Sequence, residues 1–149
     1  MSVGRICQRE VDFAERGESV FQIASRMQQR TVGAIVVLDG YRRPIGIVTD
    51  RDLATRVIAG SRDPATTTVG EVMTHKPKTV SEETAIELAL SLMRSGSFRR
   101  LPVVDRNDRL IGLVTLDDIL MLLCEEFGSI GSLLKRETPV AAAAELATA

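Results

Sequence analysis

Two short stretches of this chain carry residue types that could do chemistry, and they are copies of each other. One is the run Gly-Ile-Val-Thr-Asp-Arg-Asp-Leu, which begins at residue 46, and the other is Gly-Leu-Val-Thr-Leu-Asp-Asp-Ile, which begins at residue 112. Each run is apolar and strand-like, and it ends at a threonine that an aspartate follows three residues later. The pairs are Thr49 with Asp52 and Thr115 with Asp118. We therefore treat these two strand-to-helix corners as the candidate functional centres.

Each threonine and aspartate pair has two interpretations, which the residues alone leave open. A threonine with an acid at the third following position is similar to a capping box at a helix start, although Glu or Gln is usual there. Alternatively the corner is a nucleoside site, because an ionised aspartate accepts hydrogen bonds from two neighbouring ribose hydroxyls. The threonine hydroxyl and the free N–H groups of the helix start would then face a phosphate. Gly46 or Gly112 would let a flat base approach the backbone.

The acidic side chains at both corners would repel a phosphate unless cations lie nearby. Arg99 and Arg100 can supply positive charge if the symmetry between the two copies brings them to the opposite corner. Taken in isolation, two adjacent arginines are typical of solvated surface. Their counterparts in the first copy, Gly33 and Ala34, are uncharged. We therefore predict that the two sites grip phosphate unequally.

The copies extend far beyond the corners. An offset of 66 residues aligns them without a gap, and six of eleven positions in 43–53 are identical in 109–119. Units this small bury too little apolar surface to be stable alone, so we expect them to share a core. The predicted organisation is a first unit at 1–62, a linker at 63–68, a second unit at 69–127 and a C-terminal extension at 128–149.

Apolar periodicity predicts the same elements in both units. Stripes at helical spacing indicate long helices around 20–27 and 86–93, the second with Ser81 and Gly96 as candidate caps. Continuous β-branched runs indicate buried strands. The expected strands are 11–13, 34–38, 45–48, 78–80, 101–104 and 111–114, and the expected opening turns and closing helices are 3–8, 69–74, 50–59 and 116–127.

The closing helix at 116–127 is apolar on nearly every face. Such a helix must be covered on both sides, so we favour a subunit interface over a deep intramolecular core. A short helix is expected at 129–137, and the Ala-rich residues 138–149 are expected to be a disordered tail. Cys7 and Cys124 are expected to be buried small apolar residues rather than a disulfide or metal pair.

Composition excludes several classes of function. The formal net charge of −1 over 149 residues gives no general attraction to nucleic acid or to an anionic membrane. No apolar run approaches a transmembrane span and no secretory signal is present, so we expect a cytoplasmic protein. The single histidine, His75, is expected in an exposed loop, and with two distant cysteines it builds neither a catalytic set nor a metal site. We predict that the protein is not an enzyme.

The combined motifs resemble a tandem pair of CBS domains, the module named after cystathionine β-synthase. The resemblance covers about residues 3–127 and rests on the two Gly-hydrophobic-Val-Thr-x-x-Asp runs and on the segments 32–37, 69–74 and 99–105. It implies an α/β fold of the α+β type, in which two β-α-β-β-α units pack sheet to sheet with pseudo-twofold symmetry. It also implies adenosine-containing ligands in two clefts between the units, and disc-to-disc dimers.

The resemblance assigns roles to particular residues. Asp52 and Asp118 are implied ribose ligands, and Thr49 and Thr115 are implied to contact ribose or phosphate. Residues of neighbouring strands are implied to flank the base or phosphate: Phe13, Ala14, Gly33, Ala34, Ile35, Thr79, Val80, Arg99, Arg100, Leu101 and Pro102.

The expected function is that of a non-catalytic regulatory module. It binds AMP, ADP or ATP, with NAD or S-adenosylmethionine as further candidates, and it requires no cofactor or metal. It forms a homodimer through terminal helices that include 116–127, and it relays the bound state to an unidentified protein target. The alternative is a ligand-free adaptor that uses the paired units as a scaffold for protein–protein interaction.

Overall fold

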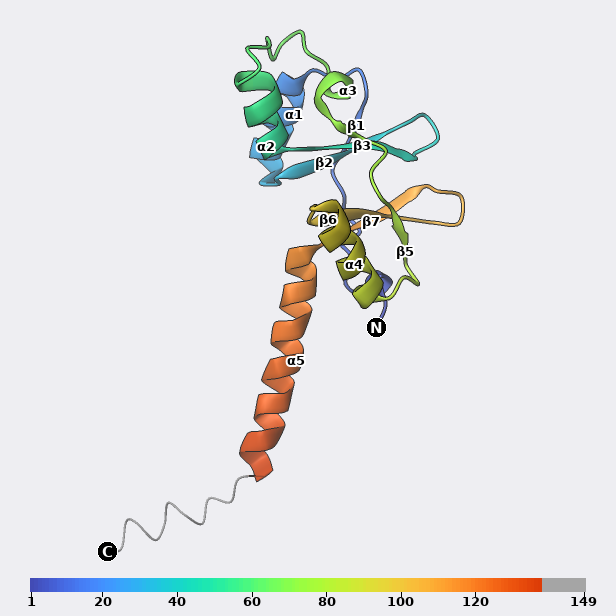
Figure 1. Cartoon of the computed structure of the whole chain (residues 1–149), viewed down its shortest axis with the longest axis vertical. Helices are drawn as coiled ribbons and strands as arrows, with labels where there is room; N and C mark the ends of the chain where they lie inside the picture. The colour runs from blue at the N-terminus through green and yellow to red at the C-terminus, as the bar shows by residue number, and fades with distance from the viewer. Residues whose placement is uncertain (138–149) are drawn as a thin grey trace, which may run out of the picture.

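The computed structural model describes residues 1–137, in which two small sheets lie against each other with helices on their outer sides (Figure 1). The first sheet has the strand order β1-β2-β3-β4, and the second has the order β5-β6-β7. In chain order the elements are η1 (Val3–Arg5), β1 (Phe13–Glu15), α1 (Val20–Arg30), β2 (Ala34–Leu38), β3 (Pro44–Thr49), α2 (Asp50–Asp52), η2 (Leu53–Ile58), α3 (Val69–Val72), β4 (Thr74–His75), β5 (Val80–Ser81), α4 (Ile86–Gly96), β6 (Arg100–Val104), β7 (Leu110–Thr115) and α5 (Leu116–Glu137).

Strand β2 shows why the continuous apolar runs are strands covered on both faces. Successive side chains of a strand point to opposite faces of its sheet. Ile35 and Val37 belong to the buried cluster of the first unit, beneath its helices. Val36 belongs to a separate cluster with Leu110 and Leu113 of the second sheet. This shared cluster confirms the expected α/β architecture of two units packed sheet to sheet.

The opening segments of the two units are exchanged. Val3 and Cys7 are buried in the core of the second unit, while Met73 is buried in the core of the first. Strand β4 accordingly pairs antiparallel with β3, and Gln8 makes the matching bridge to Leu113 of β7. The repeat predicts that each opening segment belongs to its own unit, whereas the structure places it on the other unit. Each core is therefore completed by the other copy.

The two long helices begin and end at residues that differ in part from those expected. Ser19 caps α1, since its Oγ accepts from the N–H of Gln22 at 3.2 Å and its N–H donates to Oε1 of Gln22 at 3.0 Å. The expected N-cap of α4, Ser81, is wrong, because Ser81 ends β5 and α4 begins five residues later. The expected C-cap Gly96 is also wrong, because Gly96 is the last residue of the helix and the C-cap is Ser97, which is left-handed with φ 53°.

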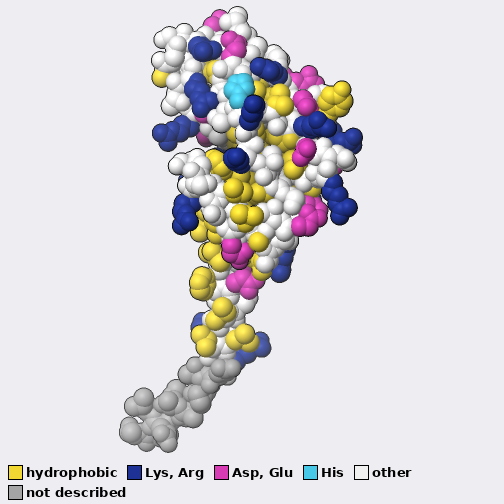
Figure 2. All heavy atoms as spheres, turned by 45° about the vertical axis from the view of Figure 1, so that its right-hand side comes forward, with side chains coloured by type: hydrophobic (Ala, Val, Ile, Leu, Met, Phe, Trp, Pro, Cys, Tyr) yellow, Lys and Arg dark blue, Asp and Glu magenta, His cyan; other side chains and the backbone are white. Residues whose placement is uncertain are grey.

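Helix α5 is a single helix of 22 residues that leaves the body of the domain (Figure 1). The separate helices expected at 116–127 and 129–137 are one continuous element. Ile119 is buried in the second unit, whereas Leu123, Phe127 and Ile130 are exposed. Figure 2 shows hydrophobic side chains along the projecting part of the molecule.

The expectations for the two cysteines, the histidine and the C-terminal tail have different outcomes. Cys7 is buried as expected, and this burial raises the pKa of its thiol. Cys124 lies exposed on α5, so the expectation of a buried residue is wrong there. His75 is exposed as expected, although it lies in β4 rather than in a loop. The disordered tail expected at 138–149 lies outside the described residues.

Candidate functional site

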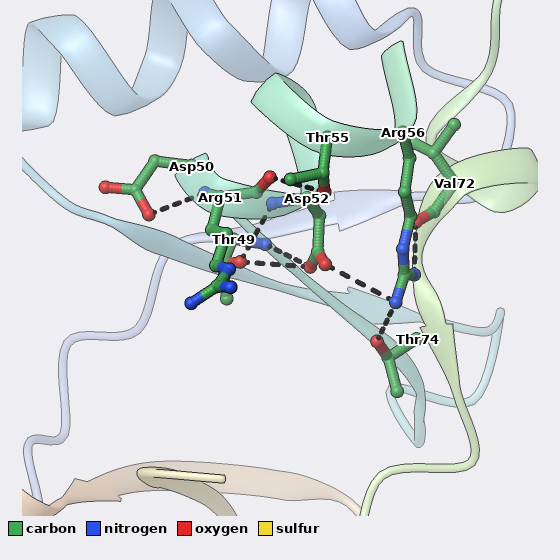
Figure 3. Close-up of polar contacts among 8 residues, drawn as sticks. All are labelled: Thr49, Asp50, Arg51, Asp52, Thr55, Arg56, Val72 and Thr74. Carbon is green, nitrogen blue, oxygen red and sulfur yellow. Dashed lines mark hydrogen bonds and ion pairs between the residues drawn. The ribbon is translucent and has the colours of Figure 1, made fainter. Parts of the chain in front are cut away.

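Both strand-to-helix corners are capping boxes. At the first corner the N–H and Oγ1 of Thr49 donate to Oδ2 of Asp52 at 2.9 and 3.0 Å, and the N–H of Asp52 donates to Thr49 Oγ1 at 3.2 Å (Figure 3). Thr115 and Asp118 repeat these contacts at 2.7, 2.8 and 3.1 Å. Each box uses one carboxylate oxygen, so capping leaves the Oδ1 atom of each aspartate for another partner.

The Oδ1 atoms of the two aspartates have different neighbours. Oδ1 of Asp52 lies 3.5 Å from Nη2 of Arg56, and that Nη2 also donates to Oγ1 of Thr74 at 3.2 Å. Oδ1 of Asp118 instead accepts a hydrogen bond from Nε2 of Gln8 at 2.9 Å. Both aspartates are half-buried, but the second oxygen of Asp52 has a cationic neighbour and that of Asp118 has a neutral one.

The helix that follows Asp52 is not a regular α-helix. Helix α2 is three residues long and continues as a π-helix, η2, whereas Asp118 lies within the regular helix α5. In this region Oγ1 of Thr55 donates to the carbonyl oxygen of Arg51 at 2.8 Å. Short π-helical stretches are frequent at functional sites. The sequence pattern, which is apolar at ordinary helical spacing, does not reveal this change.

The first corner opens into a cleft of about 650 Å³ that both units line. Thr49 and Asp52 contribute from the first unit, and Arg99 and Arg100 contribute from the second. The structure therefore brings the two arginines to the corner of the opposite copy. Their positive charge therefore lines the same cleft as the candidate ribose-binding carboxylate.

Three further cations of this cleft were missed by sequence analysis. They are Arg51, which follows Thr49 by two residues, and Lys76 and Lys78, which follow β4. The repeat contains a signal for Lys76. The offset of 66 residues aligns Lys76 with the acidic residue Glu10, so the two copies differ in charge at this position.

The second corner opens into a smaller cleft of about 300 Å³. Thr115 lines it together with Gly33 and Ala34, and Arg100 lines this cleft as well as the first. Asp117 contributes a carboxylate, whereas Asp118 is not among its lining residues. The two clefts are thus related by the internal symmetry but are unequal in size and charge.

Other predicted site residues lie away from both clefts. Phe13 is exposed, and the guanidinium carbon of Arg42 lies 5.5 Å from the centroid of its ring. Thr79 lines a separate hollow beside the turn that follows β2. The remaining ones are buried within the strands: Ala14, Ile35, Val80, Leu101 and Pro102.

Gly46 and Gly112 face the exchanged segments. A Cβ atom on Gly46 would collide with the side chain of Met73, and one on Gly112 would lie 3.0 Å from the carbonyl oxygen of Gln8 and 3.1 Å from Sγ of Cys7. The expectation that these glycines admit a flat base is therefore wrong. They instead let the opening segment of the other unit lie directly against the strand.

The fold and its paired clefts define the class of protein, a tandem CBS pair. The sequence profile described as CBS domain matches residues 3–59 and again residues 69–125. The chain belongs to the CBS domain family, which confirms the resemblance drawn from the motifs.

Curated relatives share this region and differ in total length. MK0525 of Methanopyrus kandleri is 35% identical over 122 residues, which are 82% of this chain and 62% of that protein. YlbB of Bacillus subtilis is 41% identical over 103 residues, which are 68% of each chain. CBSCBSPB2 of Arabidopsis thaliana is 36% identical over 129 residues, which are 87% of this chain but 23% of that protein. The chain therefore spans less than two thirds of the length of some relatives that it matches.

Solved structures share the fold. A protein with CBS domains from Burkholderia ambifaria is 29% identical, with a TM-score of 0.76 over 83% of this chain and 93% of that one. Hypoxic Response Protein I, solved with two coordinated zinc ions, is 29% identical, with a TM-score of 0.74 over 81% and 98%. The CBS domain pair of MJ0100, solved with 5′-methylthioadenosine and S-adenosylmethionine, is 24% identical, with a TM-score of 0.77 over 85% and 98%. This last likeness is one of fold alone.

Among residues 1–137, none of the helices has both the length and the apolar character needed to cross a membrane. Within the same residues, no three or more His, Cys, Asp or Glu side chains are grouped so that they could hold a metal ion.

Proposed function

We propose that this chain is a non-catalytic regulatory module that binds an adenosine-containing ligand in the cleft at the first corner. The observation that carries the proposal is that Asp52, Arg99 and Arg100 line one cleft although they come from different units. A carboxylate accepts hydrogen bonds from neighbouring ribose hydroxyls, and guanidinium groups donate to phosphate. AMP, ADP and ATP present both groups, so they are the proposed ligands.

The size and the apolar part of the cleft support a ligand of this kind. Small-molecule sites usually enclose roughly 300–1,000 Å³, and this cleft holds about 650 Å³. Ile47, Pro77 and Phe98 line it and offer apolar surface to a flat base. The solved complex of MJ0100 holds two adenosine-containing compounds in the same fold. We therefore keep S-adenosylmethionine and NAD as test ligands.

The regulatory part of the proposal follows from the fact that both units line the first cleft. A ligand in the first cleft touches both units, because the lining belongs to both. It can shift their packing only if it binds one arrangement more tightly than another. We propose that a protein partner responds to this shift.

Helix α5 supports a homodimer as part of the proposal. Leu120, Leu123, Phe127 and Ile130 are exposed along it, at spacings of three, four and three residues. This spacing is that of the a and d positions of a coiled coil, in which apolar residues recur every 3.5 residues on average. A second copy of α5 presents the same seam and is the partner that we propose.

A ligand-free adaptor is the second candidate, and the exposed apolar residues of α5 favour it equally. The two candidates differ in the clefts, because an adaptor needs no affinity for small molecules. A partner protein would then recognise the dimer in a single state.

The proposal is tested by titration calorimetry. AMP, ADP, ATP, NAD and S-adenosylmethionine are titrated in turn into protein from which bound nucleotide has been removed. We expect saturable binding of at least one adenine nucleotide. Mass spectrometry of small molecules released from freshly purified protein identifies any ligand that was carried along. Absence of heat with all five compounds would overturn the proposal and leave the adaptor.

A further inference from the structure

The two clefts are built from matched positions that differ in charge. The internal symmetry relates each residue of the first cleft to the residue 66 positions earlier or later in the chain. The pairs in which the first cleft has a cation and the second an acid or a neutral residue are Lys76 with Glu10, Lys78 with Asp12, Arg51 with Asp117, Arg99 with Gly33 and Arg100 with Ala34.

Most cations of the first cleft have no acidic partner. Among the described residues, Arg51, Lys76, Lys78 and Arg100 form no ion pair with a carboxylate. Figure 3 shows the side chain of Arg51 extending away from the carboxylate of its neighbour Asp50. Five Lys or Arg side chains line this cleft against two carboxylates, those of Asp50 and Asp52, so positive charge is in excess and the cleft attracts an anion.

The Arg99 side chain of the same cleft does have a partner, but a weak one. It lies 3.7 Å from Asp117, and the two side chains are 67% and 77% exposed. Exposed pairs of this kind contribute little and are screened by salt. Arg99 therefore remains able to exchange this carboxylate for a phosphate.

The second cleft has the reverse character. Glu10 forms no ion pair among residues 1–137, and Asp12 is paired with Arg30 at 3.0 Å. Glu10, Asp12 and Asp117 line the second cleft at the positions that correspond to two lysines and an arginine in the first cleft. The only Lys or Arg side chain lining this cleft in the described residues is Arg100, which it shares with the first. A polyphosphate placed there would meet like charge.

The backbone at Lys76 differs from that of its counterpart as well. Lys76 has φ 49°, in the left-handed region, and its N–H donates to the carbonyl oxygen of Ile45 at 3.1 Å. Glu10 does not share this conformation. A left-handed backbone costs free energy for a residue with a Cβ atom. The chain retains a lysine here although glycine would relieve this cost.

We propose that the two clefts have different ligand classes, with a phosphate-bearing adenosine ligand bound only in the first. Lys76 and Lys78 are the specificity-determining residues, because they supply positive charge where the second cleft has acids. The second cleft excludes phosphate, so the chain binds one phosphorylated nucleotide. This inference rests on the proposed function, and it names the ligand class of the first cleft and the class that the second cleft excludes.

Adenosine and ATP, titrated into three forms of the protein, test the inference. The wild type is expected to bind one ATP per chain, about tenfold or more tightly than adenosine, because several charge-assisted hydrogen bonds are added. Sodium chloride should weaken ATP binding and leave adenosine binding nearly unchanged. The double variant Lys76→Glu with Lys78→Glu should lose most of the ATP advantage while adenosine affinity stays within about twofold.

The control variant Arg106→Glu, at an exposed position that lines neither cleft, should leave ATP binding unchanged. Two ATP molecules bound per wild-type chain, or an equal loss of ATP and adenosine affinity in the lysine variant, would overturn the inference. If the double variant is unfolded by circular dichroism, Lys78→Gln alone provides the same comparison. Failure of both adenosine and ATP to bind the wild type would instead contradict the proposed function itself.

Discussion

Arg56 joins Asp52 to the exchanged segment of the second unit. Its Nη2 atom lies 3.5 Å from Oδ1 of Asp52, while its Nη1 atom donates to the carbonyl oxygen of Val72 at 2.7 Å. One guanidinium group therefore links the proposed ribose-binding carboxylate to the chain that leads into β4. Asp118 has Gln8 in the corresponding place, which is uncharged. Each aspartate is thus connected to the exchanged segment of the other unit, Asp52 through Arg56 and Asp118 directly by Gln8.

Arg56→Ala should weaken both the fold and the ligand site. Hydrogen bonds to charged groups typically contribute about 1.5–3 kcal/mol, and the 44% exposure of this side chain reduces that value. We expect the free energy of unfolding in urea to fall by about 1–2 kcal/mol, and ATP affinity to fall as well. Arg106→Ala, in the exposed turn before β7, is the control and should change neither quantity. Equal effects of the two substitutions would contradict this role of Arg56.

Gly46→Ala should destabilise the protein because the new methyl group meets Met73. Overpacking of a filled core typically costs about 1–3 kcal/mol. Gly40→Ala is the matched control, since a Cβ atom there meets nothing within 4 Å. The double variant Gly46→Ala with Met73→Ala should recover part of the loss relative to the sum of the single variants. Strict additivity in urea denaturation would show that the two residues do not compete for the same space.

Glu18 makes part of the stability dependent on pH. Its hydrogen bond from Arg26, at 2.6 Å, holds the pKa of the Glu18 carboxyl below the ordinary value of 4.5. The resulting stabilisation is fully present above that ordinary value and is lost as the pH falls through the lower pKa of the folded state. Glu18→Gln should therefore cost about 1 kcal/mol at pH 7 and progressively less below pH 4.5.

The measurement for Glu18 is the free energy of unfolding from pH 7 to pH 3. Glu87→Gln, at an exposed position in the first turn of α4, is the control. A Glu18→Gln deficit that stays constant across this range would contradict the linkage.

The seam of α5 can be tested by oligomeric state. Light scattering after size-exclusion chromatography should give twice the mass of one chain for the wild type. Leu123→Lys with Phe127→Lys should give the mass of a single chain, because charged residues at a and d positions oppose coiled-coil pairing. Ser132→Lys, which lies off the seam on the same helix, should remain dimeric. A dimer that survives the double substitution would show that α5 is not the interface.

The strands and corners were predictable because each has a local sequence signal. The run from Ala34 to Leu38 is continuously apolar and β-branched, which is the pattern of a strand covered on both faces. Thr49 and Asp52 occupy the N-cap and N3 positions of a helix start, so their spacing alone predicts their contact. In such segments the local pattern and the tertiary environment agree.

The exchange and the cation set were not predictable in the same way. A repeat aligns Cys7 with Met73 but does not say which unit each one packs on. Ser19 caps α1, which the apolar periodicity of 20–27 does not indicate, and α5 continues through Gly128 and Gly131, residues that disfavour helix interiors. Lys76 became a site residue only because β4 joins the sheet of the other unit. These features depend on contacts between segments that are far apart in the chain.

The affinity of ATP for Asp52→Asn, compared with Asp118→Asn, tests the central claim most directly. Both substitutions keep the shape of the side chain and remove one charge from a capping box, but Asp52→Asn also weakens the ion pair with Arg56, so the stability of both variants is measured alongside affinity. We predict at least a roughly tenfold loss of affinity for Asp52→Asn, because a charge-assisted hydrogen bond to the ribose is lost. Asp118→Asn should stay within about twofold of the wild type. Unchanged affinity in Asp52→Asn, in protein shown to be folded, would contradict the account.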